Sequence, residues 1–456
     1  MTTQPPIDSE CTDQSTKDAS RHTRDNTVTP TDPHVTIEDM PIHPSERKNR
    51  QHTHNTNVTP IGRKSGATSL PQTSEQSLPS SRPVVVAATQ KSGSNTSSSK
   101  NLRVPLSILD LSPKSEGSSR KDALDASLEL AKVADRNGYA RYWMAEHHGS
   151  MAFMSSATAL LLARAAEHTE RVRIGAGGVM LPNHTPLMVA EYYGTLATLY
   201  GDRIDLGLGR APGTDPITAS TLRRGSAELD DFSRDVTELK SYLADFSEDE
   251  APPTLSGAEA AVLGIPYRPQ VQRRHVRAIP GEGTKVPLWM LSSSAAGAHV
   301  AAELGMPYSF ASHFAPSAME KALQTYRDNY QGDSPWALRK EPYVMAGVQV
   351  MVAPTREEAE YLASSGRQLR SDIRRGVPSE LKPPQKDMHD TRPDLRLVDA
   401  SGSPSFEIVG TPQDVVAGLE ALVNFWEMDE LIVITWAYDP KMRERSYELL
   451  AQAWNG

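Results

Sequence analysis

The chain has 456 residues with a single cysteine, and 57 acidic side chains against 48 basic ones give a formal charge of −9. One thiol excludes a disulfide framework and any cysteine-based zinc or iron–sulfur site. The negative charge gives no reason to expect a nucleic acid as partner. No apolar run approaches the ~18 residues of a membrane span, so we expect a cytoplasmic protein without membrane contact.

The first hundred residues differ in composition from the rest of the chain. They are rich in Ser, Thr, Pro, Asn and Gln and show no sustained apolar periodicity. Such a segment buries too little apolar surface to offset an ordering entropy of about 1–2 kcal/mol per residue. We therefore predict a disordered extension over residues 1–100 and one folded domain over residues 101–456.

From residue 104 onward, apolar strands alternate with amphipathic helices. The predicted strands are Val104–Leu109, Arg141–Ala145, Val172–Met180, Arg203–Leu208, Val286–Leu291, Tyr308–Ser312, Val344–Val352 and Glu430–Thr435. The predicted helices are Lys121–Asn137, Ser155–Glu167, Pro186–Tyr200, Asp231–Phe246, Ala295–Leu304, Ser317–Tyr330, Arg356–Arg370, Pro412–Phe425 and Met442–Trp454. Eight strands, nearly all followed by a helix, predict an α/β fold of the (β/α)8 TIM-barrel type; a doubly wound open sheet is the alternative. The irregular stretches Glu248–Gly283 and Gly376–Ser405 are expected to be inserted loops.

The tripeptide Glu146-His147-His148 directly follows the second predicted strand. Active sites of parallel barrels are assembled at the C-terminal ends of the strands. An imidazole, with an ordinary pKa near 6.5, could donate or accept a proton there, although a structural role is equally plausible. Neighbours on an extended chain point to opposite faces, so we do not expect the adjacent histidines to chelate one ion, and no metal site is predicted.

A glycine-rich segment follows the fourth predicted strand. Gly207, Gly209 and Gly213 do not match the dinucleotide-binding pattern G-x-G-x-x-G, and Pro212 interrupts the place where its helix should begin. The segment instead favours a strand end of little side-chain bulk that a flat ligand can approach. Arg210 would supply a fixed positive charge for a phosphate. The alternative is a glycine-rich turn with a surface arginine.

Small residues mark two further strand ends. Near the end of the third strand, Gly177 and Gly178 weaken the strand unless a planar ring or a tightly packed helix approaches the backbone. After the fifth strand, the start of a helix offers backbone N–H groups and a positive dipole end to a phosphate. Capping of the helix by hydroxyl groups is the alternative there. The residues of this second segment are Ser292, Ser293, Ser294, Ala296 and Gly297.

Taken in chain order, four segments closely resemble the bacterial luciferase-like flavin-dependent oxidoreductases. They are Tyr142–His148, Arg173–His184, Pro186–Glu191 and Gly201–Asp215, and the resemblance runs from about Val104 to the C-terminus. It implies a TIM barrel that binds FMN, with the ring in the barrel mouth.

The resemblance also implies a role for each candidate residue. His147 would be the catalytic histidine with His148 beside it, and Arg210 with Ser292–Gly297 would hold the phosphate. A non-proline cis peptide would fall at Gly177–Gly178. Gly209 stands where luciferase carries a reactive cysteine, so we expect a non-luminous member.

The resulting hypothesis is a monooxygenase that receives reduced FMN from a separate reductase. It would use O2 to oxidise a small organic substrate, which the residues do not identify, with His147 relaying protons. Two alternatives are an F420-dependent reductase or dehydrogenase and a non-catalytic flavin-binding protein. A homodimer is expected by resemblance alone. Four apolar residues could wall the mouth, and packing in the core is at least as plausible for each: Met144, Met180, Phe153 and Trp289.

Overall fold

The computed structural model describes residues 103–456 except 212, 224–231, 246–275, 314, 335–336 and 387–405. The predicted disordered extension over residues 1–100 lies outside the described residues. Most of the two predicted loop insertions, 248–283 and 376–405, also lies outside them. Among the helices that are described, none is long and apolar enough to cross a membrane.

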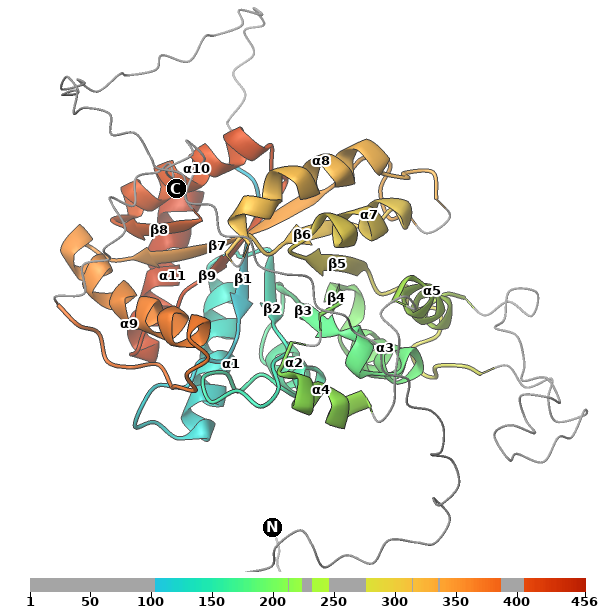
Figure 1. Cartoon of the computed structure of the whole chain (residues 1–456), viewed down its shortest axis with the longest axis horizontal. Coiled ribbons are helices and arrows are strands. Elements are labelled where there is room, and N and C mark those ends of the chain that lie inside the picture. Colours follow the sequence, from blue (N-terminus) through green and yellow to red (C-terminus); the bar gives the residue numbers. More distant parts are fainter. Residues whose placement is uncertain are drawn as a thin grey trace, which may run out of the picture. The chain divides into compact units, whose positions relative to one another are not determined.

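Eight parallel strands form a closed barrel with helices around it (Figure 1). Each strand pairs with the next, and the last pairs with both β7 and β1, which closes the ring and excludes the open sheet. The barrel strands are β1 (Leu106–Asp110), β2 (Arg141–Met144), β3 (Arg173–Met180), β4 (Ile204–Gly209), β5 (Leu288–Ser292), β6 (Tyr308–Phe310), β7 (Val344–Val352) and β9 (Glu430–Ile434). The TIM-barrel prediction is therefore confirmed.

Helices follow the strands in chain order (Figure 1). They are α1 (Arg120–Arg136), α2 (Thr158–Glu167), α3 (Pro186–Tyr200), α4 (Pro216–Arg223), α5 (Phe232–Leu243), α7 (Ala295–Glu303), α8 (Met319–Asn329), α9 (Arg356–Arg374), α10 (Pro412–Trp426) and α11 (Pro440–Asn455). Short 3-10 turns are η2 (Leu181–Asn183), η3 (Gly201–Arg203) and η5 (Pro316–Ala318). Their N-termini follow local sequence signals: Ser119 and Thr411 form capping boxes, and prolines occupy the first turns of α3, α10 and α11.

Two elements were not predicted. A ninth strand, β8 (Glu407–Gly410), pairs with β7 outside the barrel: β7 pairs with β9 as far as Gln349 and continues alongside β8. The four residues of β8 are too few to show a strand period. Helix α4 follows the glycine-rich segment after β4, and its sequence offers only a short apolar pattern.

Side chains alternate between the inside and the outside of the barrel, as the two-residue period of a strand requires. On β2, Trp143 belongs to the apolar cluster inside the barrel, whereas Tyr142 and Met144 pack in the layer between strands and helices. For Met144 the core-packing alternative therefore holds, because its position in the alternation points it away from the barrel interior. Phe153 and Trp289 do belong to the inner cluster.

Charged side chains fill the N-terminal end of the barrel. Arg141 Nη1 lies 2.5 Å from Asp205 Oδ2, and Arg141 Nε lies 2.9 Å from Glu430 Oε1. Arg173 also pairs with Asp205 at 2.7 Å, and both carboxylates are completely buried. The guanidinium of Arg141 lies 4.6 Å from the centre of the Trp289 ring in the next layer. This end of the barrel is closed by an ion-pair network beneath aromatic side chains.

Candidate active site

The predicted site residues all lie at the C-terminal ends of neighbouring strands, β2 to β5. Gly209 on β4 pairs with Met180 on β3 and with Leu291 on β5. Arg210 and Ser292, the next residues of β4 and β5, therefore come at the same level on adjacent strands. The structure brings Arg210 and the start of α7 to one edge of the barrel.

His147 occupies a largely apolar position after β2. Its ring centre lies 5.1 Å from that of Phe153, which in turn lies 5.4 Å from Trp436. Burial lowers the pKa of His147 to about 4, despite the opposing effect of Glu146. Its Nδ1 atom is buried and has no hydrogen-bond partner among the described residues. His147 is thus a neutral imidazole with one unfilled hydrogen-bonding position.

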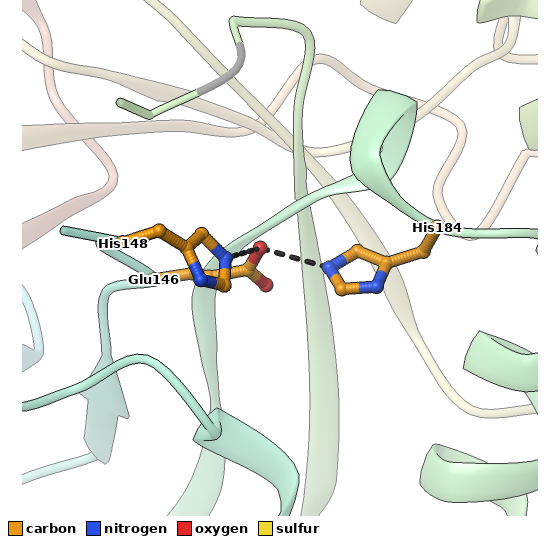
Figure 2. A group of neighbouring side chains, drawn as sticks. All are labelled: Glu146, His148 and His184. Carbon is orange, nitrogen blue, oxygen red and sulfur yellow. Dashed lines mark hydrogen bonds and ion pairs between the residues drawn. The ribbon is translucent and has the colours of Figure 1, made fainter. Parts of the chain in front are cut away.

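His148 turns to a different set of partners (Figure 2). Its Nε2 lies 2.8 Å from Glu146 Oε1, and His184 Nε2 lies 2.8 Å from the same oxygen. The side chain of Glu146 is 2% exposed. Burial disfavours the charged form of Glu146, but hydrogen bonds from both histidines outweigh it and hold its pKa below the ordinary value.

Sequence reasoning assigned no role to Glu146 or His184. A signal was available for each: Glu146 and His148 are two residues apart and so can share a face, and His184 follows the end of the next strand. The Glu146–His184 contact itself depends on the pairing of β2 with β3.

His313 is a further partly buried histidine that the sequence analysis did not single out. It follows β6, and a Cβ atom at Gly347 on β7 would lie 2.5 Å from its Nδ1. Burial, together with the charges of Arg370 and His147, lowers the pKa of His313 to about 3. No motif marks this residue; only its position after a barrel strand could have suggested it.

The peptide bond between Gly177 and Gly178 is cis, as the resemblance implies. The packing of the barrel leaves no room for a Cβ atom at either glycine. A Cβ at Gly177 would lie 2.7 Å from Leu109 Cδ1, and one at Gly178 would lie 2.8 Å from the carbonyl oxygen of Gly207. The close neighbours thus come from other strands, and the helix contact considered as an alternative is wrong.

Among the three serines at the end of β5, Ser294 caps helix α7. Ser294 accepts a hydrogen bond from the amide of Gly297 at 3.4 Å, and Ser292 Oγ lies 2.9 Å from the Tyr308 hydroxyl. The capping alternative is therefore confirmed for Ser294. Ser293 and Ala296 are exposed, and the first amides of a helix have no partner inside it, so backbone donors remain available to an anion.

Arg210 is partly buried at this edge of the barrel. It makes no ion pair or hydrogen bond with any described residue. A guanidinium without an acidic partner beside a helix N-terminus fits the phosphate of a flavin nucleotide. The residues present are consistent with such a group in their charge and in their donor chemistry.

Residues 104–426 match the family profile of the luciferase-like monooxygenases. The chain belongs to this family. Among its relatives are the YvbT protein of Bacillus subtilis (strain 168), 41% identical over 76% of this chain and 96% of the relative, and the luciferase-like monooxygenase of Escherichia coli (strain K12), 40% identical with the same coverage. The N-acetyl-S-alkylcysteine monooxygenase of B. subtilis is 30% identical over 77% of this chain and 98% of that protein. Members of the family are oxidoreductases.

Solved structures show the same fold. Apo-MsnO8 is 32% identical, has a TM-score of 0.66, and covers 77% of this chain and 99% of its own. More distant neighbours bind different cofactors. An oxygenating constituent of 3,6-diketocamphane monooxygenase from Pseudomonas putida, in complex with FMN, has a TM-score of 0.53 at 17% identity and covers 76% and 97% of the two chains. An F420-dependent secondary alcohol dehydrogenase has a TM-score of 0.50 at 14% identity and covers 77% and 99%.

Proposed function

We propose that this family member is a monooxygenase that uses reduced FMN and O2 to oxidise a small organic substrate. The observation that carries the proposal is the meeting of Arg210 with the start of α7 at the C-terminal edge of the barrel. This edge also carries a partly buried histidine, His147, whose buried Nδ1 has no hydrogen-bond partner among the described residues. Relatives named as monooxygenases support the same reaction class.

Each part of the site has a distinct role in this proposal. Arg210 and the first amides of α7 hold the FMN phosphate. The aromatic side chains of Phe153 and Trp436 exclude water from the neighbourhood of His147. The Nδ1 atom of His147 accepts a hydrogen bond from a reacting group or donates one to it. Bound FMN supplies, in its reduced form, the electrons that activate O2. A separate reductase delivers the reduced flavin.

An F420-dependent hydride transfer is the second candidate, because an F420-dependent dehydrogenase shares the fold. A non-catalytic flavin-binding protein is the third. Titration of the purified protein with FMN and with F420, followed by absorbance, distinguishes the cofactors. Incubation with reduced FMN, isotopically labelled O2 and a metabolite extract then tests the reaction, and we expect a product that carries one labelled oxygen atom.

The three candidates give different results in this experiment. Tight F420 binding with substrate reduction and no O2 consumption would replace the FMN proposal by the second candidate. Flavin binding without any substrate-dependent product, and a His147→Ala variant indistinguishable from the parent protein, would leave only the third.

We also propose that the protein forms a homodimer through α2 and α3. Met188, Tyr192 and Leu199 are exposed large apolar residues at helical spacing on α3, and Leu160 on the neighbouring helix α2 is 74% exposed. An apolar stripe of this kind on a folded protein marks an interaction surface.

A further inference from the structure

Three donor groups from two separate loops meet beside the barrel mouth. Glu146 and His148 follow β2, and His184 follows β3 and the turn η2. Their donor atoms, one carboxylate oxygen and two imidazole nitrogens, all lie within 4.8 Å of one another. Figure 2 shows both imidazoles directed at the same carboxylate from opposite sides. Among the described residues, this is the one group of three or more such side chains that could hold a metal ion.

Within the described part of the chain, no lysine or arginine pairs with Glu146. Its ion-pair partners there are the two histidines. A carboxylate that is 2% exposed requires a positive partner, because an isolated buried charge is costly. A divalent cation bound between the three donors would satisfy this requirement without a proton on either imidazole Nε2.

The donor set and its geometry favour one class of metal. Two imidazoles and one carboxylate are the ligands of many catalytic zinc sites, whereas Mg²⁺ and Ca²⁺ prefer oxygen ligands alone. Zinc–ligand bonds of about 2.0–2.2 Å in a tetrahedron place donors about 3.3 Å apart. The two present N···O distances are 2.8 Å and all three donor atoms lie within 4.8 Å of one another, so rearrangement of the side chains would have to bring all three pairs of donors to this spacing.

The site is also reachable from solvent. The side chains of His148 and His184 are 14% and 28% exposed, while Glu146 lies beneath them. We propose that Glu146, His148 and His184 bind a zinc-class divalent transition metal, with the fourth position open to water. The ion joins the loop after β2 to the turn after β3. The site adjoins His147, but binding of the ion can be measured without flavin.

The experiment is a titration of the full chain with Zn²⁺ against a competing chromophoric chelator, with Co²⁺ as a spectroscopic probe. We expect one Zn²⁺ site per chain in addition to any Zn²⁺ bound weakly by other side chains. With Co²⁺ we expect an absorption spectrum typical of tetrahedral coordination. Residues 1–102 contain His52 and His54, whose imidazoles can also bind Zn²⁺. A variant with both replaced by alanine serves as the parent for all comparisons.

Ligand variants then locate the site. In that parent, His184→Ala and His148→Ala should each weaken Zn²⁺ binding by about tenfold or more and abolish the tetrahedral Co²⁺ spectrum. His299→Ala is the matched control, because His299 forms a similar pair with Glu303 at 3.1 Å on the surface of α7. Circular dichroism confirms that each variant is folded. Both ligand variants change partly exposed side chains and leave the buried Glu146 in place.

The outcomes are distinct. The site is supported if Zn²⁺ binding is weakened in the two ligand variants, His148→Ala and His184→Ala, and the Zn²⁺ affinity of the His299→Ala variant is unchanged. Equal Zn²⁺ affinity in all variants, or the lack of a stoichiometric site in the parent, would mean adventitious binding only and would overturn the inference. Because Zn²⁺ binding is measured without flavin, failure here leaves the proposed oxygenation untouched, and failure of that reaction leaves the metal site standing.

Discussion

Arg141 and Glu430 are 289 positions apart in the chain, yet Arg141 Nε donates a hydrogen bond to Glu430 Oε1 at 2.9 Å inside the barrel. Arg141 is the first residue of β2 and Glu430 is the first residue of β9, so both lie at the N-terminal end of the barrel. Tyr343 donates a further hydrogen bond to the other oxygen of Glu430 at 3.0 Å, and Arg141 also pairs with Asp205. One guanidinium therefore connects strands that are distant in sequence.

Replacing Arg141 by methionine should lower the free energy of unfolding by about 3–5 kcal/mol, because two buried carboxylates lose a shared cation. Chemical denaturation measures the change. Arg164→Met is the control, since Arg164 pairs with Asp125 on the surface with its side chain 43% exposed, and its loss should change the free energy by at most about 1 kcal/mol. Equal effects of the two substitutions would contradict the role given to the network.

Arg210→Ala should weaken FMN binding by about 2–5 kcal/mol, as the loss of a charged partner at a binding interface does. Riboflavin, which lacks the phosphate, should bind the variant and the parent protein equally. Fluorescence titration with both ligands measures this difference. If FMN affinity is unchanged, or if both ligands lose affinity equally, Arg210 does not contact the phosphate.

Leu160→Glu combined with Leu199→Glu should convert the proposed dimer to a monomer. Both side chains are exposed apolar groups on α2 and α3, and a charge on each would have to lose its water in an apolar interface. Light scattering coupled to size-exclusion chromatography gives the mass in solution. Ile217→Glu on α4 introduces a charge at another exposed apolar residue and should leave the mass unchanged. A monomeric parent protein would refute the dimer.

Lys240 on α5 should make stability depend on pH in the alkaline range. Burial lowers its pKa from 10.5 to about 8, so between these values the unfolded chain binds more protons than the folded chain. The free energy of unfolding therefore rises as the pH increases from about 8 toward 10. Below pH 8 the full destabilising effect of the buried Lys240 is present.

The comparison of the parent protein with Lys240→Met isolates this effect. The variant has no titrating amine, so its advantage in stability should be largest at neutral pH and should shrink as the pH rises. A difference of one pKa unit between the two states corresponds to about 1.4 kcal/mol. Urea denaturation at several pH values measures the trend, and a constant difference between the two proteins would contradict it.

The barrel could be predicted from the sequence because its strands and helices repeat two clear periods. Helix α3 begins at Pro186 and ends at Tyr200 as predicted, and β7 has the predicted bounds Val344–Val352. Met144 shows the limit of this reasoning. Its apolar side chain suits either face of β2, and the register of the closed ring decides that it points outward.

The candidate site was predictable where chemistry and strand ends coincide, as for Arg210 and Ser294. The partners of Glu146 were not predictable in the same way, because its contact with His184 spans 38 positions and requires β2 and β3 to pair in one particular register. His313 has no motif around it, and it acquires its surroundings from Gly347 on the next strand.

The ion-pair network beneath Trp289 limits the paths by which small molecules can move through the barrel. With Arg141, Asp205 and Glu430 locked together, nothing can pass along the barrel axis from one side of the protein to the other. A small molecule that moves along the barrel axis would therefore have to enter and leave at the C-terminal ends of the strands.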